Sequence, residues 1–78
     1  MKKGWIPTDE DIQWTRNLVR MLKNGGIWGT SYAIFKKLSN DEFELIEKNL
    51  SLPKDFLEFE IEKVRIVFSH LGIKLKGV

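Results

Sequence analysis

The sequence predicts a small α+β domain, in which a β-hairpin packs against two amphipathic helices in the order α-β-β-α. Apolar residues recur at helical spacing in two segments, 9–24 and 53–71. The segment between them, 27–48, is rich in β-branched and aromatic residues and has turn residues in its middle. With 78 residues the chain is expected to form one domain, 1–78, near the size at which a single core only just offsets the chain entropy.

The first helix is expected over residues 9–24, after an N-terminal tail of residues 1–7. Thr8 suits the N-cap position, and the three carboxylates that follow it favour the positive end of the helix dipole. Gly25 and Gly26 provide a helix stop in the left-handed conformation. The apolar residues on one stripe of this helix are Trp14, Leu18, Met21 and Leu22, widened by Ile12 and Val19.

The hairpin is expected over residues 27–48, with Asn40 and Asp41 at its tip. A regular register then places Leu38 opposite Phe43, Lys37 opposite Glu44 and Phe35 opposite Ile46. Alternation puts apolar side chains on both faces of the hairpin. One face carries Trp28, Thr30, Tyr32, Ile34, Leu38, Phe43 and Leu45. The other face carries Ile27, Gly29, Ser31, Ala33, Phe35 and Ile46.

An alternative interpretation of the middle segment is helical. Ser39 and Glu42 match a capping box, and Phe43, Ile46 and Leu50 also have helical spacing. Residues 31–49 would then form a helix-turn-helix, and the whole chain would be all-α.

The last helix is expected over residues 53–71, with Pro53 in its first turn. Its main apolar stripe consists of Leu57, Ile61, Val64, Phe68 and Leu71. Phe59 and Ile66 form a second apolar ridge on the opposite side of this helix. The remaining residues, 72–78, alternate in polarity and are expected to be a tail or a short strand.

Composition excludes several function classes. The chain has no cysteine and one histidine, so neither disulfides nor a Cys/His zinc site is expected. The net charge of +2 is too small for a strongly basic nucleic-acid binder. No apolar run approaches the roughly 18 residues that span a bilayer, and no signal peptide precedes the first helix. The sequence therefore predicts a cytoplasmic protein with no membrane partner.

Chemical motifs are also lacking. His70 lies near the end of the last helix, where a histidine complements the helix dipole, and no carboxylate is spaced to orient it. The glycines around Gly25 follow a helix, whereas phosphate-binding glycines precede one. We expect no catalytic residue, no metal ligand and no cofactor, and hence no enzyme.

The run WTRNLVRMLKNGGIWGTSYAIFKK, from Trp14 to Lys37, resembles a pattern in short uncharacterised proteins of marine phages and bacteria. In that pattern a helix ending in a Gly-Gly stop leads into an Ile/Val-Trp strand and a hairpin. This chain has Thr30 and Ser31 where that group has Pro-Arg. The resemblance implies a phage accessory protein but assigns no activity and no site.

Two functions are consistent with these features. The first is a self-associating protein-interaction module, because two helices are not expected to cover a hairpin that is apolar on both faces. We therefore predict a homodimer that also binds an unidentified protein partner. The candidate interface residues are Trp28, Tyr32, Ile34, Phe43, Leu45, Phe59 and Ile66.

The alternative function is nucleic-acid binding through an aromatic and basic surface. Aromatic rings stack on bases, and nearby cations contact phosphates. Acidic residues on the second strand of the hairpin, Glu42, Glu44 and Glu47, would oppose such binding. The candidate contacts are Arg16, Arg20, Trp28, Tyr32 and Lys36.

Overall fold

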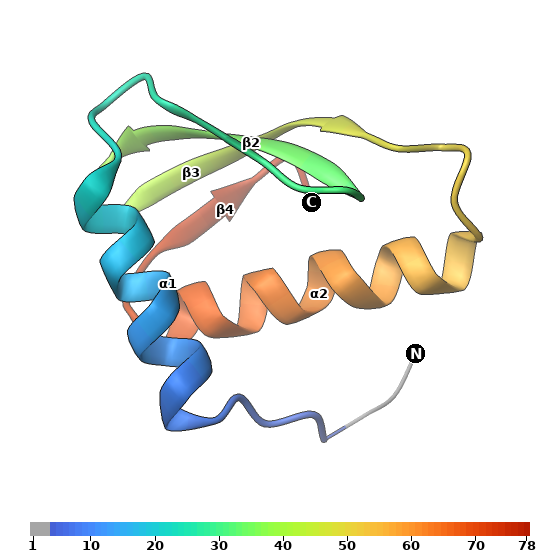
Figure 1. The fold of residues 1–78 in the computed structure, drawn as a ribbon, viewed down its shortest axis with the longest axis horizontal. Helices are drawn as coiled ribbons and strands as arrows, with labels where there is room; N and C mark the ends of the chain where they lie inside the picture. Colours follow the sequence, from blue (N-terminus) through green and yellow to red (C-terminus); the bar gives the residue numbers. More distant parts are fainter. Residues whose placement is uncertain (1–3) are drawn as a thin grey trace.

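The computed structural model describes residues 4–78, so residues 1–3 of the predicted N-terminal tail lie outside the described part. It contains two helices and a four-stranded sheet, which confirms the α+β class (Figure 1). The elements are α1 (Asp9–Met21), β1 (Ile27–Gly29), β2 (Ala33–Ser39), β3 (Glu42–Lys48), α2 (Lys54–His70) and β4 (Lys74–Lys76). The middle segment is extended, so the all-α alternative is wrong.

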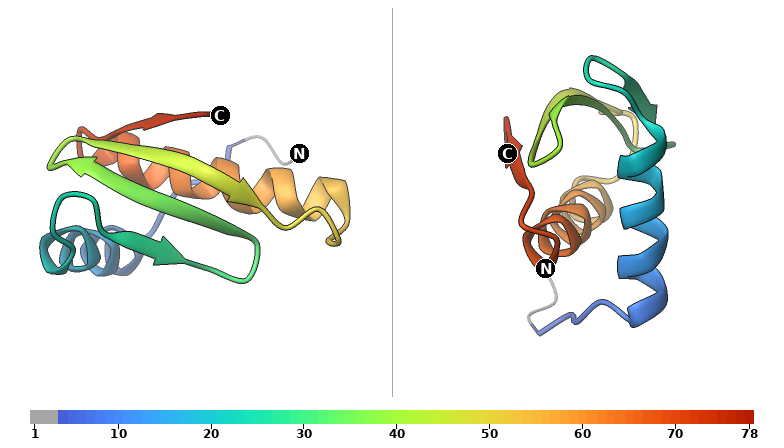
Figure 2. Two further views of the ribbon diagram at one scale, coloured as in Figure 1. Left: turned by 90° about the horizontal axis from the view of Figure 1, so that it is seen from above. Right: turned by 90° about the vertical axis from the view of Figure 1, so that its left-hand side faces the viewer.

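The strands are ordered β1-β2-β3-β4 across the sheet. The first three form an antiparallel meander, and β4 runs parallel to β3. α2 lies along one face of this sheet, while α1 crosses α2 steeply and meets the sheet with its C-terminal end (Figures 1 and 2). In residues 4–78 no helix covers the opposite face of the sheet.

α1 begins as predicted but ends earlier. Thr8 is its N-cap and forms a capping box with Asp11, with the Thr8 hydroxyl accepting from the Asp11 amide at 3.1 Å. The helix stops at Met21, not at residue 24, because the backbone of Leu22 is already extended. Its buried residues are Thr15 and Val19. The predicted stripe is therefore wrong at two positions, since Met21 is 84% exposed and Trp14 is 59% exposed.

The strand predicted to run continuously from residue 27 is divided in two, so the predicted hairpin is a three-stranded meander. A tight turn around Thr30 separates β1 from β2. The Thr30 hydroxyl donates to the Ala33 carbonyl at 2.8 Å and accepts from the Ala33 amide at 2.9 Å. This short polar side chain satisfies the backbone at the turn, which is a common role for threonine outside regular structure.

The turn between β2 and β3 lies where the sequence predicts it, with Ser39 opposite Glu42. One residue further from the tip, Leu38 is left without a partner and forms a β-bulge. The predicted register is therefore wrong by one residue. Phe43 lies opposite Lys37, not Leu38, and Glu44 lies opposite Lys36. Phe35 lies opposite Leu45 and not Ile46, which falls at a second irregularity.

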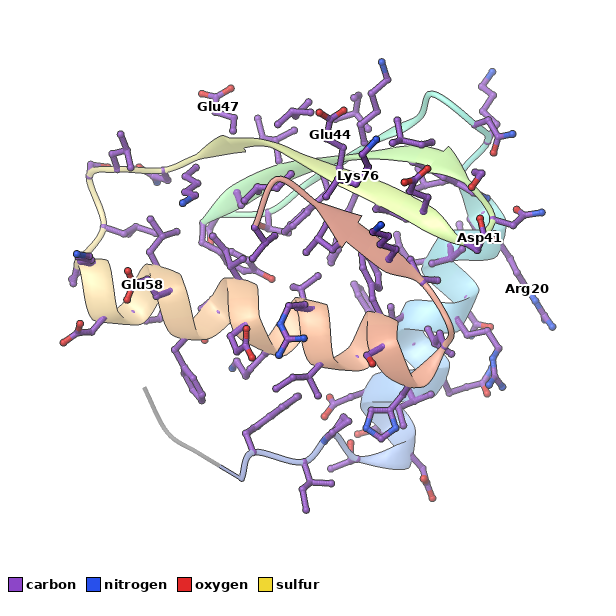
Figure 3. All side chains as sticks on the ribbon, turned by 180° about the vertical axis from the view of Figure 1, so that it is seen from behind. Arg20, Asp41, Glu44, Glu47, Glu58 and Lys76 are labelled. Carbon is purple, nitrogen blue, oxygen red and sulfur yellow. The ribbon has the colours of Figure 1, made fainter. Side chains whose placement is uncertain are left out.

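This bulge decides which side chains enter the core. Because the side-chain period of a strand is two, a slip of one residue exchanges the two faces. Here it brings Phe35, Phe43 and Leu45 onto the same face, where all three are buried against α2. The predicted assignment of side chains to the two faces is therefore wrong for Phe35, which shares the inner face with Phe43 and Leu45. The outer face is mixed and carries the apolar residues Ile27, Ile34 and Leu38. On the outer face Lys36, Glu44 and Lys76 form a row of alternating charge across β2, β3 and β4, and Figure 3 shows Glu44 and Lys76 beside each other there.

The core is centred on three fully buried phenylalanines, Phe35, Phe43 and Phe68. The rings of Phe43 and Phe68 lie 4.8 Å apart between centroids, so α2 contacts β3 directly. Four residues of the predicted α2 stripe are buried as expected, Leu71 is only half-buried, and Val67, which is not part of the predicted stripe, is buried as well. The tail 72–78 does form a short strand, β4, whose Leu75 packs against this core.

A buried lysine joins α1 to the sheet. Lys37 points inward from β2, is only 3% exposed, and donates from Nζ to the carbonyls of Val19 at 2.8 Å and Leu22 at 2.7 Å. Carbonyls at a helix C-terminus have no intrahelical donor, and a cation there also complements the helix dipole. Lys37 therefore closes the end of α1 and holds that end against β2.

We predict that Phe68→Ala destabilises the protein by about 3–5 kcal/mol, because it removes a fully buried ring from the centre of the core. Urea unfolding followed by circular dichroism measures this change. Phe56→Ala is the control, since Phe56 lies on the same helix but is 46% exposed. A midpoint for Phe68→Ala close to that of the wild type would contradict this description of the core.

We predict that Lys37→Met destabilises the protein by about 1–3 kcal/mol, because the two α1 carbonyls lose a charged donor in a buried position. Lys36→Met is the matched control: its side chain lies on the outer face, and the expected change is within about 0.5 kcal/mol. Equal effects of the two substitutions in the same urea experiment would show that the buried hydrogen bonds contribute nothing.

Candidate aromatic binding pocket

An open pocket of about 510 Å³ lies between α1, α2 and the turn that joins β1 to β2. Its lining includes every tryptophan of the chain and its single tyrosine. These rings are Trp5, Trp14, Trp28 and Tyr32. We refer to this site as the aromatic pocket. Aromatic walls with a few polar groups are typical of ligand and partner sites in proteins.

The rings reach the pocket from separate parts of the chain. Trp5 precedes α1, in the segment that passes beneath α2 in Figure 1. Trp14 is contributed by α1, Trp28 by β1, and Tyr32 by the turn before β2. Trp28 stacks on the buried Phe35 at 4.9 Å between centroids and is therefore held by the core. Trp14 lies 6.2 Å from Trp28 and keeps most of its surface in solvent.

Charged groups of both signs lie among these rings. Glu60 and Lys63 enter the pocket from α2, and Asp11 enters from the first turn of α1. Lys63 Nζ lies 2.9 Å from a Glu60 carboxylate oxygen and 5.8 Å from the centroid of the Trp5 ring. The second oxygen of Asp11, Oδ2, accepts from the Thr8 amide at 3.0 Å. The lining therefore contains two carboxylates and one ammonium group.

The phenol of Tyr32 reports on this environment. Burial raises its pKa above the usual value, the negative charge of Glu60 raises it further, and a side-chain hydrogen bond with Thr30 acts in the opposite direction. The neutral phenol is thus favoured, and Tyr32 and Glu60 both line the aromatic pocket. Tyr32 and Glu60 belong to one electrostatic unit in the pocket.

The predicted interface residues do not form one surface. Phe43 and Leu45 are buried in the core of the protomer and are not available to a partner. Trp28 and Tyr32 line the aromatic pocket, whereas Ile34 lies on the outer face, opposite Glu47. The remaining two residues, Phe59 and Ile66, are partly exposed on α2.

The predicted nucleic-acid contacts are also dispersed. Trp28 points inward beside Phe35, while the next residue of β2, Lys36, points outward. Arg16 follows Trp14 by two residues, or about 200° around the helix, so the two side chains leave opposite flanks of α1. Arg20, labelled in Figure 3, projects from α1 into solvent. The structure therefore does not place the aromatic and basic groups side by side.

Of the residues that line the aromatic pocket, the sequence pointed only to Trp28 and Tyr32 as candidate contacts. It did not point to Trp5, Asp11, Trp14, Glu60 or Lys63. Trp14 was assigned to the core stripe of α1, and Trp5 to a tail. A usable signal was present, because three tryptophans exceed what the core of so small a domain needs. The three tryptophans line one pocket because of the way α1 crosses α2. The periodicity of the sequence does not predict how two helices cross.

Within residues 4–78, no three His, Cys, Asp or Glu side chains are grouped so that they could hold a metal ion. Neither of the two helices found there is long and apolar enough to pass through a bilayer.

We predict that Tyr32 titrates above the usual range of a phenol and that Glu60→Gln lowers its pKa, because the neighbouring negative charge is removed. Tyrosinate absorbance follows this group alone, since the chain has one tyrosine. The folded-state pKa is raised, so the stability contributed by the neutral phenol is present below the unfolded pKa and is lost as pH rises through the folded pKa. Glu58→Gln, on the other side of α2, should leave the titration unchanged. Identical curves for the two variants would refute the coupling.

The chain was compared with protein-family models, with curated proteins and with solved structures. No family model matches it, no curated protein matches it, and no solved structure matches it.

Proposed function

We propose that the protein is a non-enzymatic binding module that recognises another protein through the aromatic pocket. The observation that supports this proposal is the convergence of all three tryptophans on one open pocket. Trp5 and Trp14 do not belong to the core cluster or to the residues packed against it. Two tryptophans outside the core, Trp14 exposed and Trp5 half-buried, are therefore the feature that a binding role explains.

Energetic considerations point the same way. Tryptophan and tyrosine are the residue types that most often dominate the binding energy of protein interfaces, because they bury a large area at a small cost in side-chain entropy. Trp28 is fixed by its stacking on Phe35, so part of the site is formed before a partner arrives. Such preorganisation reduces the entropic cost of binding.

The homodimer stays a prediction. It follows from the expectation that two helices are not sufficient to cover a hairpin with apolar residues on both faces. The protomer buries Phe35, Phe43 and Leu45 without a partner, so its own helices cover the inner face of the sheet and only the outer face is open. The outer face carries the apolar residues Ile27, Ile34 and Leu38, of which Ile27 is 52% exposed, and the charged row through Lys36 and Glu44 crosses that face. We therefore propose the aromatic pocket, and not the outer face of the sheet, as the site of partner binding.

We predict that a partner protein is retained by the tagged wild-type chain from a lysate of its own organism, and that Trp14→Ala reduces the retained amount about tenfold or more. Truncating an interface tryptophan commonly costs about 2 kcal/mol or more, and 1.4 kcal/mol corresponds to a factor of ten. Met21→Ala is the control, because Met21 lies on the same helix, is 84% exposed and does not line the pocket.

Circular dichroism of the three proteins should be the same, since neither Trp14 nor Met21 belongs to the core. Retention of the same proteins by Trp14→Ala and by the wild type would contradict the proposal. A loss that occurs equally with Met21→Ala would also contradict it, because binding would then depend on α1 in general and not on the pocket.

A further inference from the structure

We infer that the aromatic pocket takes the guanidinium group of an arginine side chain presented by the partner protein. This inference rests on the proposed function and specifies the chemistry that the pocket recognises. It follows from four features of the described residues: the ring faces, the balance of charge, the position of Lys63 and the apolar floor.

The ring faces are suited to a cation. Indole and phenol rings are negative on their faces, and a cation above such a face within about 6 Å is attracted to it, with tryptophan the strongest and arginine the most frequent partner. Trp14, Trp28 and Tyr32 bring three such rings to one pocket. Trp14 and Trp28 are tilted by 55° to each other and are therefore not stacked face to face.

The balance of charge in the lining is negative. Asp11 and Glu60 contribute two carboxylates, and Lys63 contributes one ammonium group, so the formal sum of these three side chains at neutral pH is −1. A guanidinium group fits this sum, since its planar set of donors matches a carboxylate in two parallel hydrogen bonds. An anionic partner would have to approach both carboxylates.

At the edge of the pocket, the ammonium group of Lys63 is already bound by a carboxylate and by aromatic ring faces. Lys63 Nζ lies 2.9 Å from Glu60, 5.8 Å from the Trp5 centroid and 4.9 Å from the Phe59 centroid. An ammonium group is thus bound between ring faces and a carboxylate within the same molecule. A carboxylate accepts about four hydrogen bonds, so Glu60 keeps acceptor capacity after binding Lys63.

The depth and floor of the pocket suit the rest of an arginine side chain. Val64 and Val67 lie in the lining and are almost fully buried, as is Thr15. The methylene groups of an arginine can cover such a floor while the charged end meets the carboxylates. A volume of about 510 Å³ lies within the usual range of about 300–1,000 Å³ for specific sites.

Phosphate groups, the main alternative, fit less well. Lys63 is the single cation of the lining, and it is paired with Glu60. The lysine of the predicted nucleic-acid surface, Lys36, lies on the opposite face of the sheet from Trp28. Nucleic-acid affinity depends mainly on phosphate contacts, and the pocket offers none beyond Lys63.

Tryptophan fluorescence tests the inference directly, because all three tryptophans line the pocket. The probes are two peptides, acetyl-Gly-Arg-Gly-amide and the same peptide with citrulline, which has nearly the shape of arginine but no charge. The arginine peptide should bind about tenfold more tightly or better, which corresponds to about 1.4 kcal/mol. Equal affinities, or no binding of either peptide at millimolar concentration, would overturn the inference.

Three variants are expected to differ in their effect: one weakens binding of the arginine peptide, one leaves it unchanged and one strengthens it. Glu60→Gln should weaken binding of the arginine peptide several-fold, while Glu58→Gln should not change it, because Glu58 lies two residues away on the other side of α2 and outside the pocket (Figure 3). Lys63→Met should strengthen binding, since it removes a competing cation and keeps the length of the side chain. Weaker binding of the arginine peptide by Lys63→Met, or tighter binding of inorganic phosphate than of the arginine peptide by the wild type, would overturn the inference.

The two proposals fail separately. If Trp14→Ala abolishes retention of the partner protein but arginine and citrulline peptides bind equally, the assignment of arginine is wrong and the binding function stands. If Trp14→Ala has no effect on retention, the binding function itself is wrong.

Discussion

The buried ammonium of Lys37 constrains much of this fold. An inward-facing lysine is costly in a core unless its charge is fully hydrogen-bonded, and few groups other than the end of a helix offer several free carbonyls in one place. The carbonyls of Val19 and Leu22 fill this role. The C-terminus of α1 is therefore held at the inner face of β2, and the rest of the helix must extend from that point across α2.

The backbone of the same lysine also helps to set the register of the sheet. Its backbone amide donates to the Gly26 carbonyl and its carbonyl accepts from the Gly25 amide, so the chain leaving α1 pairs with β2 before β1 begins. Opposite Lys37, Phe43 turns inward because Leu38 is bulged out. The position of the end of α1, the pairing of β2 and the bulge at Leu38 therefore depend on one another. A change in one of them would require changes in the others.

The aromatic pocket is a consequence of this arrangement. Because α1 is held at one end and crosses α2, its first half stands away from the sheet and leaves room between α1, α2 and β1 (Figures 1 and 2). Trp28 closes the inner side of that space and Trp14 stands at its margin. Pocket shape therefore depends on core residues that do not touch it, whereas its chemistry depends on Asp11, Glu60 and Lys63, which contribute nothing to the core.

The amino-acid sequence by itself determined the α+β class, the N-terminus of α1, the inner stripe of α2 and the turn at Asn40 and Asp41, whereas it left residues 72–78 open between a tail and a short strand. These features arise from local chemistry, namely capping, side-chain periodicity and turn propensity, which act between residues a few positions apart. Only the tertiary structure decided the bulge at Leu38, the inward turn of Lys37 and the meeting of the tryptophans. Each of these depends on burial against a distant segment: Phe35 and Phe43 share one face because α2 covers that face, and Trp5, Trp14 and Trp28 meet because α1 crosses α2.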